Sequence, residues 1–378
     1  MNILLSLAGI RFDRGMGEYI RMFLPFLCKE FKKNLIVVSD RDVPNEIFNI
    51  IQNHGSLFYK KDIPYPIFEQ LIIPKIIKEY KVKVAHFPAN TFPLIKPRDV
   101  KFIVVIHDMM FLKKYKPKVL RQKIGKFYRA FIIKNGLKNI DVPIFVSNTT
   151  LNEFKKLMNN LGRTNDANVI YNPLNLCNDE KYDDSILRLL SINAGEYIYT
   201  ISGSSPNKNF DFVLKSFSKL KSTYPNLKLV VSGIYKFDDI KLFKSKIESL
   251  NIRDSVVFTG YVTEAQKKSL IKNCKTFIFL SKEEGFGRPI IEALMENAVV
   301  IASDIEIFRE IGDRFIYYID INDENSLLNF FLNHDFNLHI HSKDKILNYL
   351  RSKFDVEINA KKLINLTYKA LEGSESEF

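Results

Sequence analysis

The sequence has 378 residues, of which 46% are hydrophobic and 26% charged, a composition that excludes a disordered chain and suffices for two globular domains. It contains no apolar run of transmembrane length and no signal-peptide pattern, and its three widely spaced cysteines exclude a disulfide framework, so we expect a cytoplasmic protein. The formal net charge of +13 indicates an anionic partner, such as a membrane surface or a nucleic acid.

The first part of the chain predicts a strand, a glycine-containing loop and a helix, in that order. Residues 2–6 form a short apolar run, and a loop with Gly15 and Gly17 precedes a helical pattern. A second apolar run, 35–38, ends close to Asp40, where a dinucleotide-binding domain places an acid. The Gly-x-Gly lies well past the first strand, however, and no third glycine follows it. An NAD-dependent oxidoreductase therefore stays an alternative.

Two later strands lead to histidines. The runs 82–86 and 102–106 are apolar, and they end at His86 and immediately before His107, which is followed by Asp108. A histidine at the carboxyl end of a parallel strand lies at the edge where open α/β sheets bind ligands. The alternative for each is a hydrogen-bonded histidine near the core, and for His86 we adopt that alternative.

A stretch without acidic residues concentrates the positive charge. Residues 109–140 contain no Asp or Glu, and their basic side chains are Lys113, Lys114, Lys116, Lys118, Arg121, Lys123, Lys126, Arg129, Lys134 and Lys138. Apolar residues recur there at helical spacing, which predicts an amphipathic helix with a basic flank. Segment 113–134 is either a solvated face on a core-packed helix or an attachment site for an anionic membrane surface. No nucleic-acid-binding motif accompanies the charge, so we do not expect a nucleic acid partner.

The second half of the chain repeats the alternation of strands and helices. A polar, irregular stretch at 172–184 separates it from the first half, and a strand pattern at 197–202 restarts the alternation. A turn with Gly203 and Lys208 follows, and an apolar helical pattern comes after it. The alternation predicts a second parallel, doubly wound sheet.

One stretch of this half combines a strand, a glycine turn and a helix start. Residues 276–280 have the pattern of a buried strand, and helical spacing begins near Pro289. The turn between them leaves backbone N–H groups at a helix N-terminus, where proteins hold phosphate. Glu284 precedes the turn and Glu292 lies about one turn into the helix. Carboxylates repel phosphate, so Glu292 fits a ribose and Glu284 a transferred sugar. The alternative is a surface helix with an acid near its N-terminus.

The spacing of the two glutamates resembles the signature of the retaining GT-B glycosyltransferases of family 4 (group 1). The likeness lies in Glu-Gly-Phe-Gly-x-Pro-x-x-Glu-Ala at 284–293 and extends to 257–262 and 300–304. It implies an α/β fold of two Rossmann-like, doubly wound parallel-sheet domains that face an interdomain cleft. It also implies transfer of a sugar from a nucleotide diphosphate sugar to a hydroxyl acceptor with retention of anomeric configuration. A mannosyltransferase-like role in bacterial surface polysaccharide, lipopolysaccharide or lipid-linked glycan assembly is the expectation.

The resemblance also assigns residues to the site. It implies that His107 contacts the donor sugar and that Lys208 neutralises the donor diphosphate, so the expected catalytic residues are Glu284, His107 and Lys208. The other residues expected to bind the donor are Glu292, Gly285, Phe286, Gly287, Arg288, Pro289, Gly15, Gly17, Gly203, Tyr261 and Val262. The family often has an arginine beside the position of Lys208 or at the end of the preceding strand. This chain has none there, and Arg288 is the candidate replacement.

The predicted organisation is an N-terminal domain at 1–172, a donor domain at 173–354, a helix at 355–372 that returns to the first domain, and a tail at 373–378. No metal and no organic cofactor is expected, because Lys208 and backbone amides can stabilise the departing diphosphate. Asp40-Arg-Asp42 matches the Asp-x-Asp of metal-dependent GT-A enzymes, but nothing else in that region does.

The expected partners follow from the same resemblance and from the basic segment. They are a nucleotide-sugar donor, a glycan or lipid-linked glycan acceptor, and an anionic membrane at the inner face of the plasma membrane, where the protein would be peripheral. The alternative from another class is a non-catalytic protein that binds membranes or polyanions on the same fold. Glu284, Glu292 and Lys208 argue against that alternative.

Overall fold

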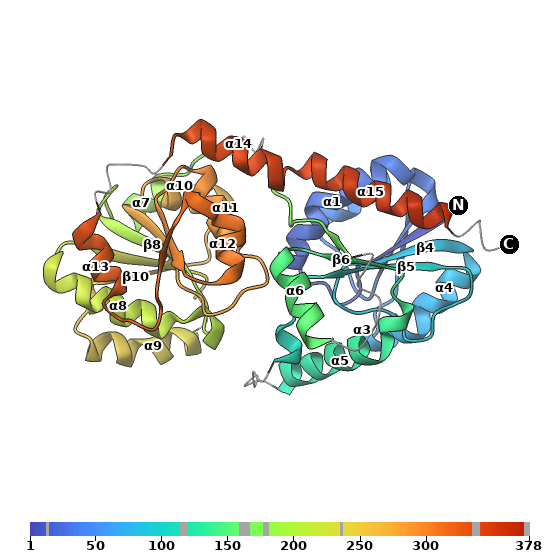
Figure 1. The fold of residues 1–378 in the computed structure, drawn as a ribbon, viewed down its shortest axis with the longest axis horizontal. Coiled ribbons are helices and arrows are strands. Elements are labelled where there is room, and N and C mark those ends of the chain that lie inside the picture. Colours follow the sequence, from blue (N-terminus) through green and yellow to red (C-terminus); the bar gives the residue numbers. More distant parts are fainter. Residues whose placement is uncertain are drawn as a thin grey trace. The chain divides into compact units, whose positions relative to one another are not determined.

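A computed structural model of the chain describes residues 1–12, 15–113, 120–158, 167–176, 181–234, 237–334 and 341–373, without the side chains of 120–122 and 237–238. The predicted tail from residue 374, Cys177 and three of the basic residues, Lys114, Lys116 and Lys118, lie outside this description. The chain divides into two compact units (Figure 1). Unit 1 contains Met1–Asn175 and the segment from Lys353, and unit 2 contains Leu176–Ser352.

Unit 1 is built on a parallel sheet, which has seven strands in the described part of the chain. Their order is β3-β2-β1-β4-β5-β6-β7. The strands are β1 (Asn2–Ser6), β2 (Leu35–Ser39), β3 (Leu57–Lys60), β4 (Val82–Phe87), β5 (Lys101–Ile106), β6 (Val142–Phe145) and β7 (Asn168–Val169). The inner strands are apolar on both faces, as a parallel sheet covered by helices requires. In β1, Ile3 and Leu5 enter one core cluster while Leu4 enters the other.

Helices cover both faces of this sheet. One face packs against α1 (Gly15–Phe31), α2 (Asn45–Asn53) and α15 (Val356–Glu372). The other packs against α4 (Ile73–Glu79), α5 (Leu120–Gly136) and α6 (Asn148–Leu157). Two short elements precede α4, namely α3 (Tyr65–Ile67) and the π-helical turn η2 (Phe68–Ile72). Figure 1 shows α1 and α15 on one side of the unit 1 sheet and α3 and α5 on the other.

The predicted basic helix is shorter at its start than expected. Lys113 lies in a bend after the 3₁₀ turn η3 (Met110–Leu112), and helix α5 begins at Leu120. Lys113 also pairs with Glu153 at 2.8 Å, so its charge is partly neutralised within the fold. None of the described helices has both the length and the apolar composition that crossing a membrane requires.

Unit 2 repeats the architecture with a six-stranded parallel sheet in its described residues. The strand order is β10-β9-β8-β11-β12-β13. The strands are β8 (Tyr197–Ile201), β9 (Lys228–Ser232), β10 (Val256–Gly260), β11 (Thr276–Phe279), β12 (Val300–Ser303) and β13 (Tyr317–Ile319). These two sheets confirm the predicted fold class of two doubly wound α/β domains.

The helices of unit 2 divide between the two faces of its sheet. One core cluster is formed with α8 (Phe210–Thr223), α9 (Phe237–Ser249) and α13 (Ser326–Asn333). Helices α10 (Glu264–Lys272), α11 (Arg288–Met295) and α12 (Glu306–Gly312) lie in the connections β10–β11, β11–β12 and β12–β13. These connections run along the sheet in the opposite direction to β8–β9 and β9–β10, so right-handed crossovers place the three helices on the opposite face. The short helix α7 (Ser185–Leu189) packs beside α10.

Two final helices carry the chain from unit 2 back into unit 1. They are α14 (Lys343–Phe354) and α15, separated by Asp355. The Asp355 carboxylate accepts a hydrogen bond from the Ile358 N–H at 3.0 Å, which caps α15. The Leu174 N–H donates to the Phe354 carbonyl at 2.9 Å, so the point where the chain leaves unit 1 is joined to the point where it returns.

Candidate active site

The strand order of unit 2 reverses between β8 and β11. The chain leaves β8 toward β9 and leaves β11 toward β12, so the two connections run in opposite directions along the sheet. Open α/β sheets bind ligands at such a switch point. The two loops here are 202–209 and 280–287, and they contain six of the fourteen residues that the sequence predicts for the site.

Backbone hydrogen bonds and two asparagine side chains hold these loops together. The Lys282 N–H donates to the Asn207 carbonyl at 2.8 Å, and the Asn207 amide donates to the Glu283 carbonyl at 3.2 Å. Asn209 adopts a left-handed conformation, with φ of 54°, and its amide donates to the Leu280 carbonyl at 3.2 Å. Asparagine tolerates this conformation better than most residues do. Lys208, between these two asparagines, is therefore fixed against the second loop.

The structure brings together two of the predicted catalytic residues. Lys208 Nζ lies 2.6 Å from Glu284 Oε1, with side chains 28% and 14% exposed. The ammonium also lies 4.9 Å from the ring centroid of Phe279, so a carboxylate and an aromatic ring define its position. A cation held this way at a loop edge can exchange a carboxylate oxygen for a phosphate oxygen without a large movement.

The glycine turn after Glu284 has a steric requirement. Gly287 has φ of 100°, and a Cβ there would lie 2.9 Å from side-chain atoms of Phe308 and Ile311, so only glycine fits without displacing α12. Helix α11 begins at Arg288 and has Pro289 in its first turn. The start of α11 therefore presents backbone N–H groups at a defined position.

One predicted donor contact in this turn has a different environment from the one expected. The side chain of Phe286 is buried, with 5% of the residue exposed. Its ring is therefore largely shielded from solvent, and its donor contact remains a prediction. Gly285, before it, is partly exposed.

Glu292 is held by two cations that the sequence analysis did not connect with it. Its carboxylate lies 3.0 Å from Lys267 Nζ and 3.6 Å from Arg288 Nε. Burial raises the pKa of Glu292, but Lys267 and Arg288 outweigh that effect, and the pKa ends below its ordinary value. Glu292 is therefore ionised at neutral pH. Lys267 also pairs with Glu264 at 2.7 Å, which fixes the cation between two carboxylates.

The sequence analysis also gave no indication of a buried hydroxyl at the carboxyl edge of the unit 2 sheet. Ser202 follows β8 and is 8% exposed, and its Oγ has no hydrogen-bond partner among the described residues. Gly233, after β9, lets the backbone pass so closely that a Cβ there would lie 2.4 Å from the Ser202 carbonyl oxygen. Buried polar atoms rarely lack a partner, so Ser202 is a candidate ligand contact.

The remaining predicted residues of unit 2 lie at the same sheet edge. Gly203 follows Ser202, and a Cβ at Gly203 would only make ordinary contact with Lys208, so glycine is not sterically required there. Tyr261 follows β10 and is 85% exposed, so its ring is not packed in the core. Val262, beside it, is partly buried. Both remain predicted contacts of the donor.

His107 belongs to unit 1, at the carboxyl end of β5. It is buried, its Nε2 lies 2.9 Å from the Pro88 carbonyl oxygen, and its ring meets that of Tyr19 edge-on at 5.1 Å. Burial lowers the pKa of His107 to about 4 although the Pro88 carbonyl opposes the shift, so the ring is neutral at pH 7. With a proton on Nε2 donated to Pro88, Nδ1 is left as a hydrogen-bond acceptor.

The two glycines of the first loop differ in what they require. Gly17 is buried near the start of α1, and a Cβ there would lie 2.4 Å from Phe12 Cα, so glycine allows the loop to cross the helix. Gly15 is exposed and has no atom near its Cβ position. Gly17 therefore has a packing role in unit 1, and any ligand contact of Gly15 remains a prediction.

The acid considered for a dinucleotide site is used by the fold. Asp40 Oδ1 accepts from the Gly9 N–H at 2.9 Å, and Oδ2 pairs with Arg41 at 2.5 Å. Both oxygens are engaged within unit 1, which weighs against a ribose contact by this residue. Asp42 pairs with Lys60 at 2.7 Å. Across the described residues, no three His, Cys, Asp or Glu side chains are grouped closely enough to hold a metal ion.

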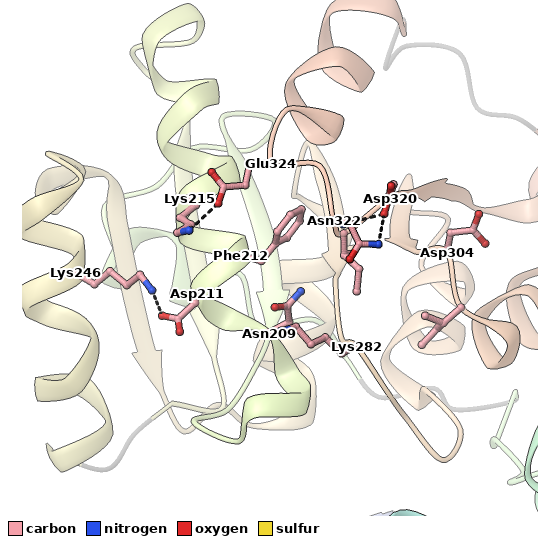
Figure 2. A pocket seen from close by; sticks show the side chains of 12 residues that line it. Asn209, Asp211, Phe212, Lys215, Lys246, Lys282, Asp304, Asp320, Asn322 and Glu324 are labelled. Carbon is pink, nitrogen blue, oxygen red and sulfur yellow. Dashed lines mark hydrogen bonds and ion pairs between the residues drawn. The ribbon is translucent and has the colours of Figure 1, made fainter. Parts of the chain in front are cut away.

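A hollow of about 630 Å³ flanks the site (Figure 2). Asn209 and Lys282 line it, but neither Glu284 nor Lys208 does. Five of its charged side chains are in ion pairs: Lys215 with Glu324 at 2.7 Å, Lys246 with Asp211 at 2.5 Å and Asp304 with Arg309 at 2.5 Å. Asp320, which also lines the hollow, accepts a hydrogen bond from the Asn322 amide at 2.9 Å.

Comparison with known proteins connects these features to a family. Residues 188–327 match the family model described as glycosyl transferases group 1. The chain is 26% identical over 279 residues to the O-antigen chain mannosyltransferase RfbU of Salmonella typhimurium, covering 74% of this chain and 72% of that protein. It is 22% identical over 332 residues to a Campylobacter jejuni relative, N-acetylgalactosamine-N,N'-diacetylbacillosaminyl-diphospho-undecaprenol 4-alpha-N-acetylgalactosaminyltransferase, covering 83% of this chain and 84% of the relative.

Among solved structures, the chain is similar to HepE of Anabaena, determined in complex with UDP and glucose. The TM-score is 0.71 at 16% sequence identity, and the match covers 97% of this chain and 99% of that one. At this identity the likeness shows the fold alone, which is the two-domain GT-B fold.

Proposed function

The chain is a group 1 glycosyltransferase with the GT-B fold, and we propose that it transfers a hexose from a nucleotide diphosphate sugar to a glycan hydroxyl with retention of configuration. The observation that carries this proposal is the Lys208–Glu284 pair beside the N-terminus of α11. Lys208 supplies a cation and the start of α11 supplies backbone N–H groups for a diphosphate. The Glu284 carboxylate lies next to Lys208 and can accept hydrogen bonds from sugar hydroxyls.

The proposed reaction assigns a role to each group. The bond between the anomeric carbon and the diphosphate oxygen breaks, and Lys208 and the N–H groups at the start of α11 stabilise the charge of the departing diphosphate. Retention places the attacking hydroxyl on the face that the diphosphate leaves. A diphosphate oxygen can therefore accept the proton that the hydroxyl loses as its oxygen bonds to the anomeric carbon. Glu284 orients the transferred sugar. His107 of unit 1 keeps the role that the family resemblance implies, a contact with the donor sugar.

Glu292 has the second assigned role, in nucleotide binding. Its carboxylate is ionised and fixed by Lys267 and Arg288, so it can accept hydrogen bonds from ribose hydroxyls without reorienting. Arg288, at the first position of α11, also lies where it can approach the diphosphate, and we propose it as the replacement for the arginine that the family often has near Lys208. Lys208, Arg288 and the N–H groups of α11 can balance the charge of the diphosphate without a metal ion.

The relatives support a narrower choice of substrates. RfbU is named as an O-antigen mannosyltransferase, and the name of the Campylobacter jejuni relative describes transfer to a diphospho-undecaprenol-linked sugar. We propose a mannose nucleotide as donor and a lipid-linked glycan as acceptor. Such an acceptor lies at a membrane, and the exposed Lys123 and Lys134 of α5 suit an anionic surface. The protein would be peripheral on the inner face of the plasma membrane.

A binding panel followed by a transfer assay tests this function. The purified chain is screened by thermal shift against nucleoside diphosphates and nucleotide sugars, because a ligand raises stability according to its occupancy. Donors that stabilise the chain are then incubated with glycan acceptors, and released nucleoside diphosphate and glycosylated product are measured. Stabilisation and transfer by the wild type, with transfer lost in Lys208→Met, are the expected results. If no nucleotide stabilises the chain and anionic polymers do, the non-catalytic alternative is correct.

A further inference from the structure

Unit 1 exposes a group of large apolar side chains that its core does not use. They come from three segments, α3 with η2, the loop 88–100 and α5, and they are Ile67 (48% exposed), Leu71 (57%), Ile95 (77%), Ile124 (59%), Phe127 (73%) and Phe131 (46%). A single exposed apolar residue is ordinary, whereas a contiguous group on one surface indicates an interaction site. We call these six residues the apolar face.

A buried polar network joins the three segments. Glu69 of η2 is 1% exposed, and its carboxylate accepts hydrogen bonds from the hydroxyls of Tyr128 on α5 and Thr91 in the loop, each at 2.6 Å. The neighbouring Gln70 donates to Tyr128 at 2.9 Å and accepts from the Leu94 N–H at 2.8 Å. Each of these partners lies within four residues of a member of the apolar face, so the network holds the three segments side by side.

Helix geometry places the exposed residues of α5 on the side toward η2. Successive residues of an α-helix are rotated by about 100°, so Ile124 and Phe131 lie within roughly 60° of Tyr128, which reaches Glu69. Phe127 lies about 100° from Tyr128 in the same sense. Its ring stacks on Phe131, with centroids 6.3 Å apart. The exposed part of α5 that borders η2 is therefore apolar.

Basic residues border the apolar face on its other side. Lys123 and Lys134 are exposed and lie roughly 120–140° from Tyr128, beyond Phe127. No acidic residue occurs anywhere in 109–140, so nothing in this stretch opposes their charge. An apolar strip with a cationic border complements the headgroups and upper acyl chains of an anionic bilayer. A soluble partner protein would instead need acids placed opposite these two lysines.

We propose that the apolar face and its lysine border form one preformed surface that docks on an anionic bilayer, with all three segments entering the boundary between headgroups and acyl chains. This inference deepens the proposed function, on which it rests for the lipid-linked acceptor. It differs from electrostatic attachment through the basic segment, because Leu71 and Ile95 lie outside that segment. The Glu69 network fixes the face before docking, so no folding accompanies the contact.

Tryptophan substitution tests the surface directly, since the chain contains no tryptophan. Single variants Leu71→Trp, Ile95→Trp and Phe127→Trp report from the three segments, and Leu189→Trp reports from an equally exposed position in unit 2. Each is titrated with vesicles of phosphatidylcholine alone and of phosphatidylcholine mixed with phosphatidylglycerol. With the anionic vesicles, we expect emission to shift to shorter wavelength at positions 71, 95 and 127, and not at 189.

Vesicle cosedimentation of the double variant Phe127→Ser/Phe131→Ser gives the size of the effect. We expect partitioning to fall about tenfold for each phenylalanine removed, with the matched control Leu189→Ser unchanged. Transfer to a short water-soluble acceptor should be the same in all variants. If the wild type transfers no sugar to this acceptor, the proposed function is contradicted. The vesicle measurement still tests the docking surface in that case.

Three outcomes would overturn the inference. A shift at position 127 without shifts at 71 and 95 would mean that α5 docks alone. Unchanged partitioning of the double serine variant would mean that charge alone holds the protein. Absence of vesicle binding, together with a concentration-dependent dimer that the serine variant abolishes, would make a second copy of the chain the occupant.

Discussion

The two units of this molecule use shielded carboxylates in opposite ways. In unit 2, Glu284 and Glu292 each lie within 3.0 Å of a lysine ammonium. In unit 1, Glu69 is surrounded by hydroxyl and amide donors, and burial raises its pKa to about 7 although the hydrogen bonds oppose the shift. A carboxylate paired with a cation stays ionised and can exchange its partner for a ligand. A carboxyl group held by neutral donors joins segments, and it loses that role if it exchanges them.

The largest effect is expected from the loss of Lys208, the cation that can exchange its carboxylate partner for a phosphate oxygen. Lys208→Met should lower the single-turnover transfer rate about 10²- to 10³-fold, because it removes a preorganised charge from the departing diphosphate. Lys282→Met is the matched control, since Lys282 is an exposed lysine on the facing loop, and it should keep the wild-type rate. Equal losses in both variants would show that general positive charge, rather than the Lys208 position, supports transfer.

A smaller effect separates the two glutamates of unit 2. Glu292→Gln should weaken the affinity for free nucleoside diphosphate by about 1.5–3 kcal/mol, the worth of a hydrogen bond to a charged group. Glu284→Gln should spare that affinity and lower turnover, because the transferred sugar is then misplaced. Isothermal calorimetry with the nucleoside diphosphate, alongside single-turnover rates, measures both. The reverse pattern would exchange the two roles, and two unaffected variants would place the site elsewhere.

The unit 1 carboxylate should affect stability rather than nucleotide binding. The folded pKa of Glu69 lies near 7, above the unfolded value of roughly 4.3, so the folded state holds the extra proton between these values. The stability that the protonated group contributes is therefore complete below about pH 4 and is lost as pH rises through about 7. The loss should be on the order of 3–4 kcal/mol.

Denaturant unfolding across this pH range measures that prediction. Glu69→Gln should show a flatter dependence of unfolding free energy on pH than the wild type, because glutamine does not titrate. The exposed Glu79→Gln, on the neighbouring helix α4, is the control and should follow the wild type. A wild-type curve that rises between pH 5 and 7, or a variant with an unchanged slope, would remove the neutral-donor interpretation.

The same comparison explains how far the sequence could predict the molecule. Apolar periodicity and glycine turns are local signals, and they were sufficient for the two sheets and for the α11 turn with Glu284. The sequence could assign Lys208 and Glu284 to one site but could not predict that they are in contact. The distance between the two side chains depends on the hydrogen bonds that pair the two loops. Nothing in the spacing of Lys267 and Glu292 indicates contact, since α10 and α11 meet only in the folded unit. The sequence likewise did not indicate that Phe286 is buried.

Unit 1 departed further from its sequence pattern. In Phe-Glu-Gln-Leu at 68–71, Glu69 resembles any surface acid, and only the π-helical turn η2 directs it into the interior. The helical spacing of Ile124, Phe127 and Phe131 predicts one apolar helix face, either packed on the core or attached to a membrane surface, and in the structure all three residues are exposed. Periodicity shows that apolar residues share a face, but it does not show what that face packs against.

The smallest effect is expected from metal removal, and the unit 2 carboxylates are the reason. A divalent ion at a diphosphate is normally held by carboxylate oxygens, and the nearest candidates, Glu284 and Glu292, are already paired with Lys208 and Lys267. Recruiting either one would release a lysine beside the ion, and the two cations would repel each other. Transfer should therefore proceed at the wild-type rate in excess EDTA. Complete loss in EDTA, with recovery on addition of Mg²⁺ or Mn²⁺, would show that Lys208 and the α11 amides do not suffice and that one glutamate leaves its lysine to bind the ion.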